Sequence, residues 1–329
     1  MDQQKILLFG ELLLRFSAGS DQFIHAGNLS IYPGGSEANV AASLGHWKLP
    51  ASYVSCVPDN ELANQALNEL TRLGVNTSLS IREGDRIGLY FLLTPNGLSK
   101  GEVVYDRKYS AFSQLKPGNI DWEKLLEGHS WFHFTALTPA LNDDLAQVIL
   151  EGLETAHKKG LTISVDLNYR NKLWNYGKQP KEVMPQLVKY ADVIMGNIWA
   201  ANTMLNIPVD ETLNRETPVN QYADHANQSA TDLFALYPQC KHVAYTFRFM
   251  DSPKHNLFYG TYHTRGINYV SEVHETFGVI DRIGSGDAFM AGLIYALSIG
   301  KNGQEVIETA TSAGFQKLFV KGDFGDGSL

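Results

Sequence analysis

Short apolar runs alternate with amphipathic segments along most of this chain, and this alternation restricts the possible folds more than any other feature. Residues 60–73 and 141–159 carry apolar side chains at helical spacing, and each segment ends at a glycine, Gly74 or Gly160. Strands that alternate with helices form parallel βαβ units. We therefore expect an α/β fold with a central, mostly parallel sheet flanked by helices, whose strands are the runs 5–9, 53–57, 131–134, 161–167, 192–195 and 243–249.

One region departs from this alternation. Residues 87–94 and 102–108 are two strand-like runs joined by Pro95-Asn96-Gly97, which is typical of a hairpin turn. Residues 11–33 also contain extended apolar segments. We expect 11–33 and 86–110 together to form a small, separate β-sheet.

The overall composition excludes several classes of protein. With 329 residues and a formal net charge of −8, the chain lacks the basic stripe that a nucleic-acid-binding surface needs. It has neither a basic leader before its first apolar run nor the ~20 consecutive apolar residues of a membrane span. Its two cysteines, Cys56 and Cys240, give no disulfide framework and no metal-ligand spacing. We expect a single domain, 1–329, in the cytoplasm.

The turn Gly284-Ser285-Gly286 precedes an apolar helix that extends to about residue 297. Unpaired N–H groups and the positive end of the helix dipole at such a turn attract an anion, above all a phosphate. Asp287 lies in the first turn of that helix, beside the same position. A carboxylate is ordinary at a helix start, but here it could also accept the proton of a hydroxyl group that attacks phosphorus.

A second glycine turn, Gly34-Gly35, precedes a helix rich in small residues, with Ser36 as its expected N-terminal cap. The alanines within residues 38–42 would let this helix pack closely against a sheet. Two adjacent glycines also allow a ligand to approach the backbone. A packing role and a ligand-binding role both fit the pattern.

Polar residues gather at two strand ends. Asp166, Asn168 and Arg170 share one face if the chain stays extended there, and ligands of α/β sheets bind at the carboxyl ends of strands. Tyr105 and Arg107 share a face of the second hairpin strand. That face could be solvent-exposed surface, or it could close over an anionic ligand, since arginine binds carboxylates in a bidentate manner.

The string from Asp281 to Asp287 resembles the signature of the PfkB, or ribokinase-like, carbohydrate kinases, in which an acidic residue and two variable residues precede Gly-Ala-Gly-Asp. The resemblance implies a ribokinase-like fold and an ATP-dependent sugar kinase. It implies that Asp287 is the catalytic base and that the N–H groups of Gly284, Ser285 and Gly286 form the anion hole. The turn at 33–42 resembles the family's N-terminal Gly-Gly…Asn signature, which assigns three residues to the sugar: Gly34, Gly35 and Asn39.

The runs 104–107 and 166–174, together with 321–324, narrow the resemblance to the 2-keto-3-deoxygluconate kinases. This implies phosphorylation of a sugar acid at its 6-position. It also implies that the small sheet is a lid over the sugar and a contact surface in a homodimer or higher homo-oligomer. The residues assigned to the keto acid are Tyr90, Tyr105, Arg107 and Arg170.

On the nucleotide side the resemblance implies ATP with Mg²⁺, and the residues assigned there are Asn168, Asn197, Thr246, Arg248, Gly284 and Gly286. Some positions depart from the family pattern. Ala200 replaces a glutamate that helps to organise Mg²⁺ in many members, and Arg282 and Ile283 stand where two threonines are common. The glycines that often follow the strand at 243–249 are absent. No metal ligand is therefore assigned.

Two alternatives remain open. A fructokinase-type or ribokinase-type enzyme for neutral sugars would use the same scaffold and base. A non-catalytic sugar-binding relative is suggested by Ala200 and by the missing glycines. Retention of Asp287 directly after the glycine turn favours a catalyst.

Overall fold

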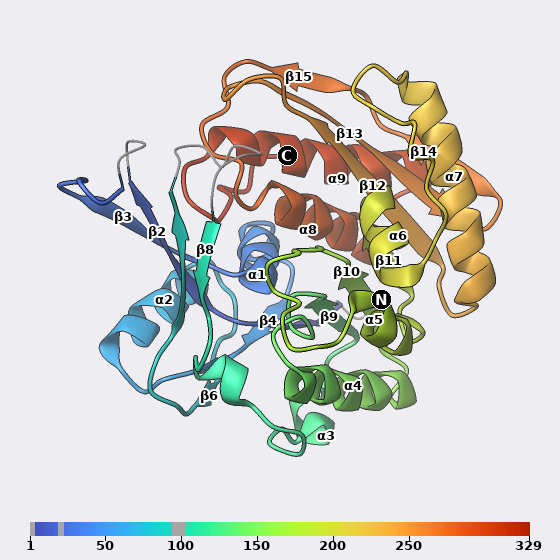
Figure 1. The fold of residues 1–329 in the computed structure, drawn as a ribbon. Coiled ribbons are helices and arrows are strands. Elements are labelled where there is room, and N and C mark those ends of the chain that lie inside the picture. The colour runs from blue at the N-terminus through green and yellow to red at the C-terminus, as the bar shows by residue number, and fades with distance from the viewer. Residues whose placement is uncertain (1–3, 19–22, 94–102) are drawn as a thin grey trace.

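The computed structural model describes residues 4–18, 23–93 and 103–329. Within that part of the chain, a nine-stranded sheet has the order β14-β13-β12-β11-β10-β9-β1-β4, and β15 pairs with β13 (Figure 1). Its strands are β1 (Ile6–Phe9), β4 (Ala51–Val54), β9 (Trp131–Thr135), β10 (Thr162–Asp166), β11 (Val193–Gly196), β12 (His242–Phe249), β13 (Asn256–Thr264), β14 (Ile267–Val270) and β15 (His274–Thr276).

The strands from β4 to β12 in this order are parallel, and β13, β14 and β15 add antiparallel pairings at one edge. Side chains alternate between the two faces of the sheet. Leu7 and Phe9 belong to one apolar cluster, whereas Ile6 and Leu8 belong to the other. Both faces are thus buried, as a parallel sheet requires. The predicted α/β architecture with a mostly parallel sheet is confirmed.

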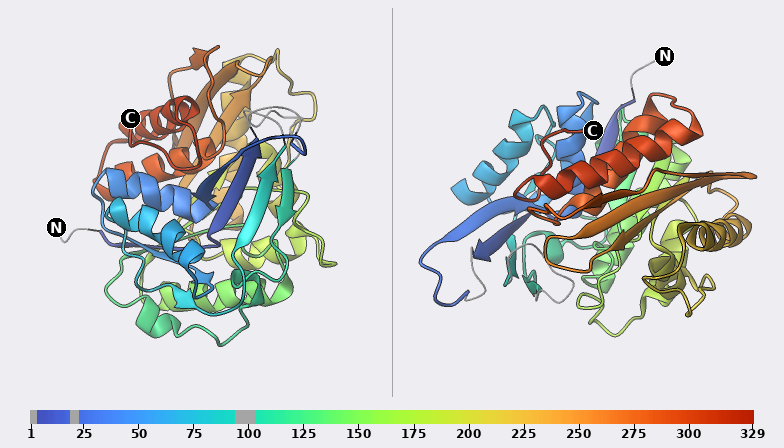
Figure 2. Two further views of the ribbon diagram at one scale, coloured as in Figure 1. Left: turned by 90° about the vertical axis from the view of Figure 1, so that its left-hand side faces the viewer. Right: turned by 90° about the horizontal axis from the view of Figure 1, so that it is seen from above.

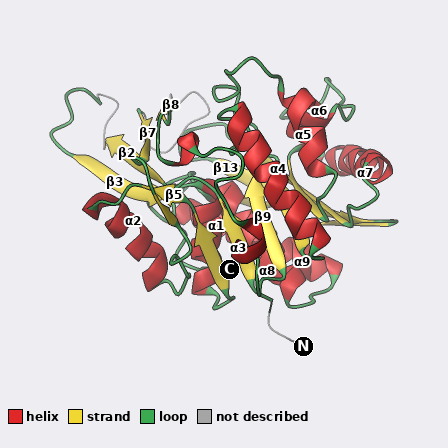
Figure 3. Cartoon of the chain, turned by 90° about the horizontal axis from the view of Figure 1, so that it is seen from below, coloured by secondary structure: helices red, strands yellow, loops and turns green. Residues whose placement is uncertain are grey.

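Helices cover both faces of the central sheet (Figures 1 and 3). The cluster that contains Ile6 and Leu8 includes side chains from α1, α2, α8 and α9, and the other cluster includes side chains from α3 to α7. No helix of the described residues is long and apolar enough to cross a bilayer. The helices are α1 (Ser36–His46), α2 (Glu61–Arg72), α3 (Trp122–Leu125), α4 (Asp143–Lys158), α5 (Pro180–Val188), α6 (Ile198–Leu205), α7 (Val219–Leu236), α8 (Ser285–Ser298) and α9 (Gly303–Gln316), with short 3₁₀ turns η2 (Phe112–Gln114) and η3 (Lys317–Phe319).

Capping residues in the sequence determine several helix ends. The side chains of Asn60 and Asn142 accept hydrogen bonds from the first turns of α2 and α4. Gly74 and Gly160 follow the last turns of the same helices with φ of 87° and 73°, a left-handed conformation that favours glycine. These ends agree with the glycine positions predicted from the sequence.

One expected element is divided in the structure. The run 53–57 supplies the end of β4 and then β5 (Cys56–Val57), which leaves the central sheet to pair with β6 (Ile81–Arg82). The last helix ends at Gln316 and is followed by η3. The two cysteines are buried and free.

A separate four-stranded sheet, here called the lid sheet, has the order β3-β2-β7-β8 among the described residues. Figure 2 shows its blue and teal strands side by side and extending beyond the main body. Its strands are β2 (Leu13–Ala18), β3 (Leu29–Gly34), β7 (Gly88–Leu92) and β8 (Val103–Asp106). The predicted small sheet is confirmed, while the turn expected at Pro95-Asn96-Gly97 lies outside the described residues.

The strand registers of the lid sheet place two rows of side chains on its opposite faces. The inner row, two members of which line a cleft described below, consists of Tyr32, Arg15, Tyr90 and Tyr105. The outer row is apolar and consists of Ile31, Phe16, Phe91 and Val104. Ile31 and Val104 are 52% and 41% exposed. The lid sheet thus presents polar side chains to the protein and apolar side chains to solvent.

Candidate active site

A cleft of about 450 Å³ opens between the lid sheet and the carboxyl ends of the central strands, where α/β proteins bind ligands. All but one of the site residues predicted from the sequence line it, and the exception is Gly34. The predicted residues that the cleft brings together are Gly35, Asn39, Tyr90, Tyr105, Arg107, Asn168, Arg170, Asn197, Thr246, Arg248, Gly284, Ser285, Gly286 and Asp287.

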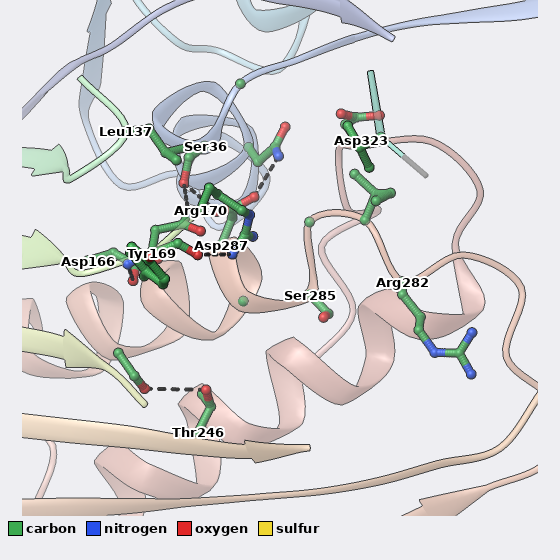
Figure 4. Close-up of a pocket in the computed structure, with 18 of the residues that line it drawn as sticks. Ser36, Leu137, Asp166, Tyr169, Arg170, Thr246, Arg282, Ser285, Asp287 and Asp323 are labelled. Atoms are coloured by element: carbon green, nitrogen blue, oxygen red, sulfur yellow. Dashed lines mark hydrogen bonds between the residues drawn. The ribbon is translucent and has the colours of Figure 1, made fainter. Parts of the chain in front are cut away.

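Asp287 lines this cleft from the first turn of α8 and is 8% exposed. Both of its oxygens are held by α1: Ser36 Oγ hydrogen-bonds to Oδ1, and Asn39 Nδ2 donates to Oδ2 at 2.7 Å (Figure 4). Burial raises the pKa of Asp287, while the hydrogen bonds from Ser36 and Asn39 and the charge of Arg170 oppose that rise. A raised pKa makes the carboxylate a stronger base.

Ser36 is a donor to Asp287 because another donor occupies its oxygen. Asn168 Nδ2 donates to Ser36 Oγ at 3.0 Å, so the single hydroxyl proton is directed at the carboxylate. The prediction that Ser36 caps α1 is wrong. The N-cap is Gly35, with no side-chain capping bond, since the Ser36 hydroxyl reaches across to α8 instead.

The turn that opens α8 has the geometry of an anion site. Gly284 is the N-cap with φ of 84°, and a Cβ there would lie 2.2 Å from the main-chain oxygen of Asp323, so only glycine fits. The N–H of Ser285 donates to Arg282 O at 3.3 Å. For the N–H groups of Gly284 and Gly286 no protein acceptor is found among the described residues. Two open amides at a helix N-terminus thus border the cleft.

Arginines add positive charge beside this turn. Arg248 Nη1 donates to Ser285 Oγ at 3.1 Å, so Arg248 lies in the cleft and not on the outer surface. Its side chain is open to solvent along the cleft, yet desolvation by the surrounding protein, followed by the like charges of Arg170 and Arg282, lowers its pKa to about 10. Arg282 points away from Asp287 (Figure 4). At neutral pH this positive field suits a polyphosphate.

Arg107 lies at the end of the lid sheet and is buried. Its Nε donates to Glu11 Oε2 at 2.5 Å, and Ser110 Oγ donates to the other oxygen of that carboxylate. The guanidinium is therefore fixed in direction, and no hydrogen bond or ion pair of its Nη atoms is found in the described part of the chain. Tyr105 lines the cleft from the same strand face, as the alternation predicted.

The hydroxyl of Tyr90 is engaged by another side chain, since it hydrogen-bonds to Asp323 Oδ2. Arg15 Nε lies 3.0 Å from Asp323 Oδ1, and the two Nη atoms of Arg15 bind Asp281 at 3.2 and 2.6 Å. Gly34 faces the same carboxylate, and a Cβ there would lie 2.1 Å from Asp323 Oδ2. Gly34 therefore makes room for Asp323 and does not line the cleft, contrary to its predicted contact with the sugar.

The chain leaves the extended conformation at the end of β10. Asn168 has φ of 20°, and its N–H donates to Asp166 Oδ1 at 2.9 Å, so residues 166–168 form a turn. The extended chain on which a shared face of Asp166, Asn168 and Arg170 depended is therefore not found, although all three line the cleft. Burial and the negative charge of Asp287 raise the pKa of Asp166 to about 7.

Asn197, which follows the end of β11, and Thr246, which lies within β12, both border the cleft. Asn197 is the N-cap of α6, and its Oδ1 accepts from Ala200 N–H at 2.8 Å. Thr246 Oγ1 donates to the main-chain oxygen of Gly196 at 3.4 Å (Figure 4). In residues 4–18, 23–93 and 103–329, no group of three or more His, Cys, Asp or Glu side chains is placed to hold a metal ion.

Residues 3–233 match the model of the pfkB family of carbohydrate kinases. The chain belongs to this family. It is 26% identical over 318 residues to the 2-dehydro-3-deoxygalactonokinase of Haloferax volcanii and 24% identical over 319 residues to the 2-dehydro-3-deoxygluconokinase of Bacillus subtilis, in each case spanning 96% of this chain and 90% of the relative.

The fold of this PfkB kinase is similar to the crystal structure of 2-dehydro-3-deoxygluconokinase from Thermotoga maritima. The TM-score is 0.89 with 34% sequence identity, and the match covers 98% of this chain and 95% of the other. The ribokinase-like architecture with a small lid sheet, implied by the sequence resemblance, is thus confirmed.

Sequence reasoning missed several residues that line the cleft of the PfkB kinase or contact a residue that does. Glu11, which orients Arg107, could have been noticed as a carboxylate directly after a buried apolar strand, where a charge needs a partner. Asp323 lies in a segment used for the resemblance, but no role was assigned to it. Other lining residues without a distinctive pattern in the sequence are Leu13, Leu137, Tyr169 and Trp199.

Proposed function

We propose that this PfkB kinase transfers the γ-phosphoryl group of ATP to the 6-hydroxyl of 2-keto-3-deoxygluconate, also called 2-dehydro-3-deoxygluconate. The observation that carries the proposal is the position of Asp287, a carboxylate whose two oxygens only accept hydrogen bonds, beside the open amides of Gly284 and Gly286. Phosphoryl transfer needs such a pair, because a base takes the hydroxyl proton while fixed donors stabilise charge on the phosphoryl oxygens.

In the proposed reaction the 6-hydroxyl attacks the γ-phosphorus in line with the departing ADP oxygen. As the new O–P bond forms and the O–P bond to ADP breaks, the hydroxyl proton passes to the Asp287 carboxylate. Ser36 and Asn39 keep the carboxylate in one orientation, so that little of the barrier comes from reorganisation. The amides of Gly284 and Gly286 would face the transferred group.

Arg107 supports a sugar acid as the substrate. Glu11 fixes its Nε, which leaves the outer edge of the guanidinium for a second carboxylate in a bidentate arrangement. Tyr105 lies on the same face, and Arg170 borders the cleft from the loop that follows β10. A neutral sugar would meet the same cations without supplying a negative charge. The relatives named for sugar-acid kinase activity support this substrate class.

ATP would enter as its Mg²⁺ complex. Mg²⁺ keeps several waters and takes one or two protein carboxylates together with substrate phosphates, and the cleft offers Asp166 for that purpose. Mg²⁺ would neutralise charge on the phosphates. Arg248 would lie near the phosphate chain, because it donates to Ser285 at the anion-hole turn. The cytoplasm, where ATP is available, is the location that we propose.

A second copy of the chain is the partner that we propose for the outer face of the lid sheet. The outer row crosses all four strands, and within it the rings of Phe16 and Phe91 stack with their centroids 5.4 Å apart. Exposed apolar rows of this kind are typical of subunit contacts. Light scattering should find a dimer or larger assembly, and Ile31→Glu should dissociate it. A monomeric wild type at micromolar concentration would contradict the assignment.

Substrate choice is tested by a coupled ADP-release assay with 2-keto-3-deoxygluconate, its galactonate counterpart, fructose, ribose and a nucleoside. The expected result is the highest kcat/KM with one of the two keto acids. A preference for fructose or ribose would establish a neutral-sugar kinase instead. Binding of a keto acid without ADP release, in the presence of MgATP, would establish a non-catalytic relative.

A further inference from the structure

Lys317 is a buried cation that the proposed reaction does not use. It is the first residue of η3 and is 2% exposed. Its ammonium group donates to the main-chain oxygens of Val320 at 2.9 Å and Gly322 at 2.8 Å. Burial lowers the pKa of Lys317, and the charges of nearby carboxylates oppose that change. A charge in such a place is costly unless surrounding groups compensate it.

The compensating groups form a cluster behind the anion-hole turn. Asp281 and Asp323 both favour the charged form of Lys317, and Asp287 does so more weakly. Arg15, from the lid sheet, pairs with Asp281 and Asp323. Two cations thus share two carboxylates in a region shielded from solvent.

This cluster contacts the turn itself. A Cβ on Gly284 would lie 3.3 Å from Lys317 Cε and 2.2 Å from the main-chain oxygen of Asp323. Asp281 Oδ2 accepts from Gly322 N–H at 3.1 Å, so the loop that the ammonium binds is also tied to the start of the anion-hole sequence. The Lys317 side chain and its loop therefore pack against Gly284, and Gly284 in turn lines the cleft.

Main-chain oxygens and carboxylates are the ligands that a monovalent cation takes when it gives up its water. We propose that the Lys317 ammonium is a built-in monovalent cation, which holds residues 320–323 against Gly284 and adds positive charge behind the anion hole. Lys317 is then a positioning residue that acts through the glycine turn, and turnover needs no K⁺ or NH₄⁺ from solution. The catalytic part of this inference rests on the proposed phosphoryl transfer.

Three variants test the proposal. Lys317→Ala removes the ammonium and its stem but leaves the main-chain oxygens of Val320 and Gly322 and space for an ion. Lys317→Met removes the charge and fills the space. Lys301→Met is the matched control, because Lys301 is half-buried and donates to Thr309 Oγ1 at 2.8 Å but does not line the cleft. For each protein, kcat and KM are measured in tetramethylammonium, Na⁺, K⁺ and NH₄⁺ chloride at constant ionic strength.

Wild type and Lys301→Met should give the same kcat in all four salts. In tetramethylammonium, Lys317→Ala should lose about tenfold in kcat, less than the roughly hundredfold that removal of a direct donor to the reacting group causes. NH₄⁺ or K⁺ should restore most of that loss, whereas Lys317→Met should stay low in every salt. Activation of the wild type by K⁺ or NH₄⁺ would overturn the proposal, and so would a folded Lys317→Ala variant with full kcat or with a loss that neither ion restores.

The melting temperature gives a readout that does not depend on catalysis. An ion bound in the space left by the lysine side chain should raise the Tm of Lys317→Ala but not that of wild type or Lys317→Met. If the wild type lacked kinase activity while this Tm pattern held, the proposed reaction would be refuted and the cation site retained. If the wild type were active and neither ion changed the Tm of Lys317→Ala, the cation site alone would be refuted.

Discussion

Asn39 Nδ2 donates to Asp287 Oδ2 at 2.7 Å, joining the first turns of α1 and α8 across 248 residues of sequence. The two helices that begin at the glycine turns are therefore not independent. One supplies the carboxylate and the open amides, and the other supplies the donors that orient the carboxylate. The two glycine-rich motifs of the sequence form one site.

Asp287→Asn should lower kcat by about a hundredfold or more, since the loss of a positioned base has this magnitude. The KM for the sugar should change little, because the amide keeps the shape of the side chain and can still hydrogen-bond to Ser36 or Asn39. Steady-state ADP release measures both constants. An unchanged kcat would show that another group takes the proton.

The pH dependence of kcat/KM should reflect the raised pKa of Asp287. Because the base must be ionised, activity should fall toward acidic pH, with its midpoint above the range of an ordinary aspartate. Ser36→Ala removes a hydrogen bond that lowers this pKa, so the midpoint should rise by about one pH unit. A midpoint that stays in place, or moves toward acid, would contradict the role given to Ser36.

Arg107→Ala should raise the KM for the keto acid by about tenfold to a hundredfold, which corresponds to a lost hydrogen bond to a charged group. The KM for fructose, which has no carboxylate, should change much less. Lys108→Ala is the matched control, because Lys108 is the exposed neighbour of Arg107 and does not line the cleft. Equal effects of Arg107→Ala on both substrates would show that the arginine does not bind the carboxylate.

Glu37→Gln should stabilise the protein at alkaline pH. Glu37 is buried, and its Oε1 accepts from both the N–H and the hydroxyl of Thr135 at 2.9 and 2.8 Å. Burial raises the pKa of Glu37 from 4.5 to about 7. The folded protein thus binds the carboxyl proton of Glu37 more tightly than the unfolded chain does. The stability that this proton contributes below pH 4.5 is lost as the pH rises to about 7.

Glutamine keeps the acceptor for Thr135 without the buried charge. The Tm of the Glu37→Gln variant should exceed that of wild type by a few degrees at pH ~8. The difference should shrink at pH ~5, where wild-type Glu37 is mostly protonated. Calorimetry at the two pH values measures this. A Tm difference that is the same at both would mean that Glu37 does not change its charge over this range.

The sequence predicted the elements whose causes are local. Apolar runs gave the central strands, asparagines and glycines gave helix ends, and the turn at Gly284 gave a site for an anion. The shared face of Tyr105 and Arg107 was predicted from strand alternation, which depends only on the pleat, whereas the assignment of Arg107 to the keto acid came from the family resemblance. These features arise from residues close together in the chain.

What the sequence did not predict depends on distant partners. Serine commonly caps helices, but the Ser36 hydroxyl donates to Asp287, which is 251 residues away in the sequence. Glu11 is separated from Arg107 by 96 residues. The close approach of Asp323 explains the glycine at position 34. A buried donor or acceptor binds whichever group the fold brings near it, and the sequence does not contain that distance.

The loop bound by Lys317 has a consequence for biosynthesis. Its residues pack against Gly284, and Trp47 Nε1 donates to the main-chain oxygen of Gly327 at 2.9 Å. The ribosome adds these residues after every other part of the cleft has been translated. A nascent chain can pair its central strands early, but it cannot complete the phosphate site until that loop has left the exit tunnel. A chain that stalls or is truncated before this loop should therefore form its central strands but lack kinase activity.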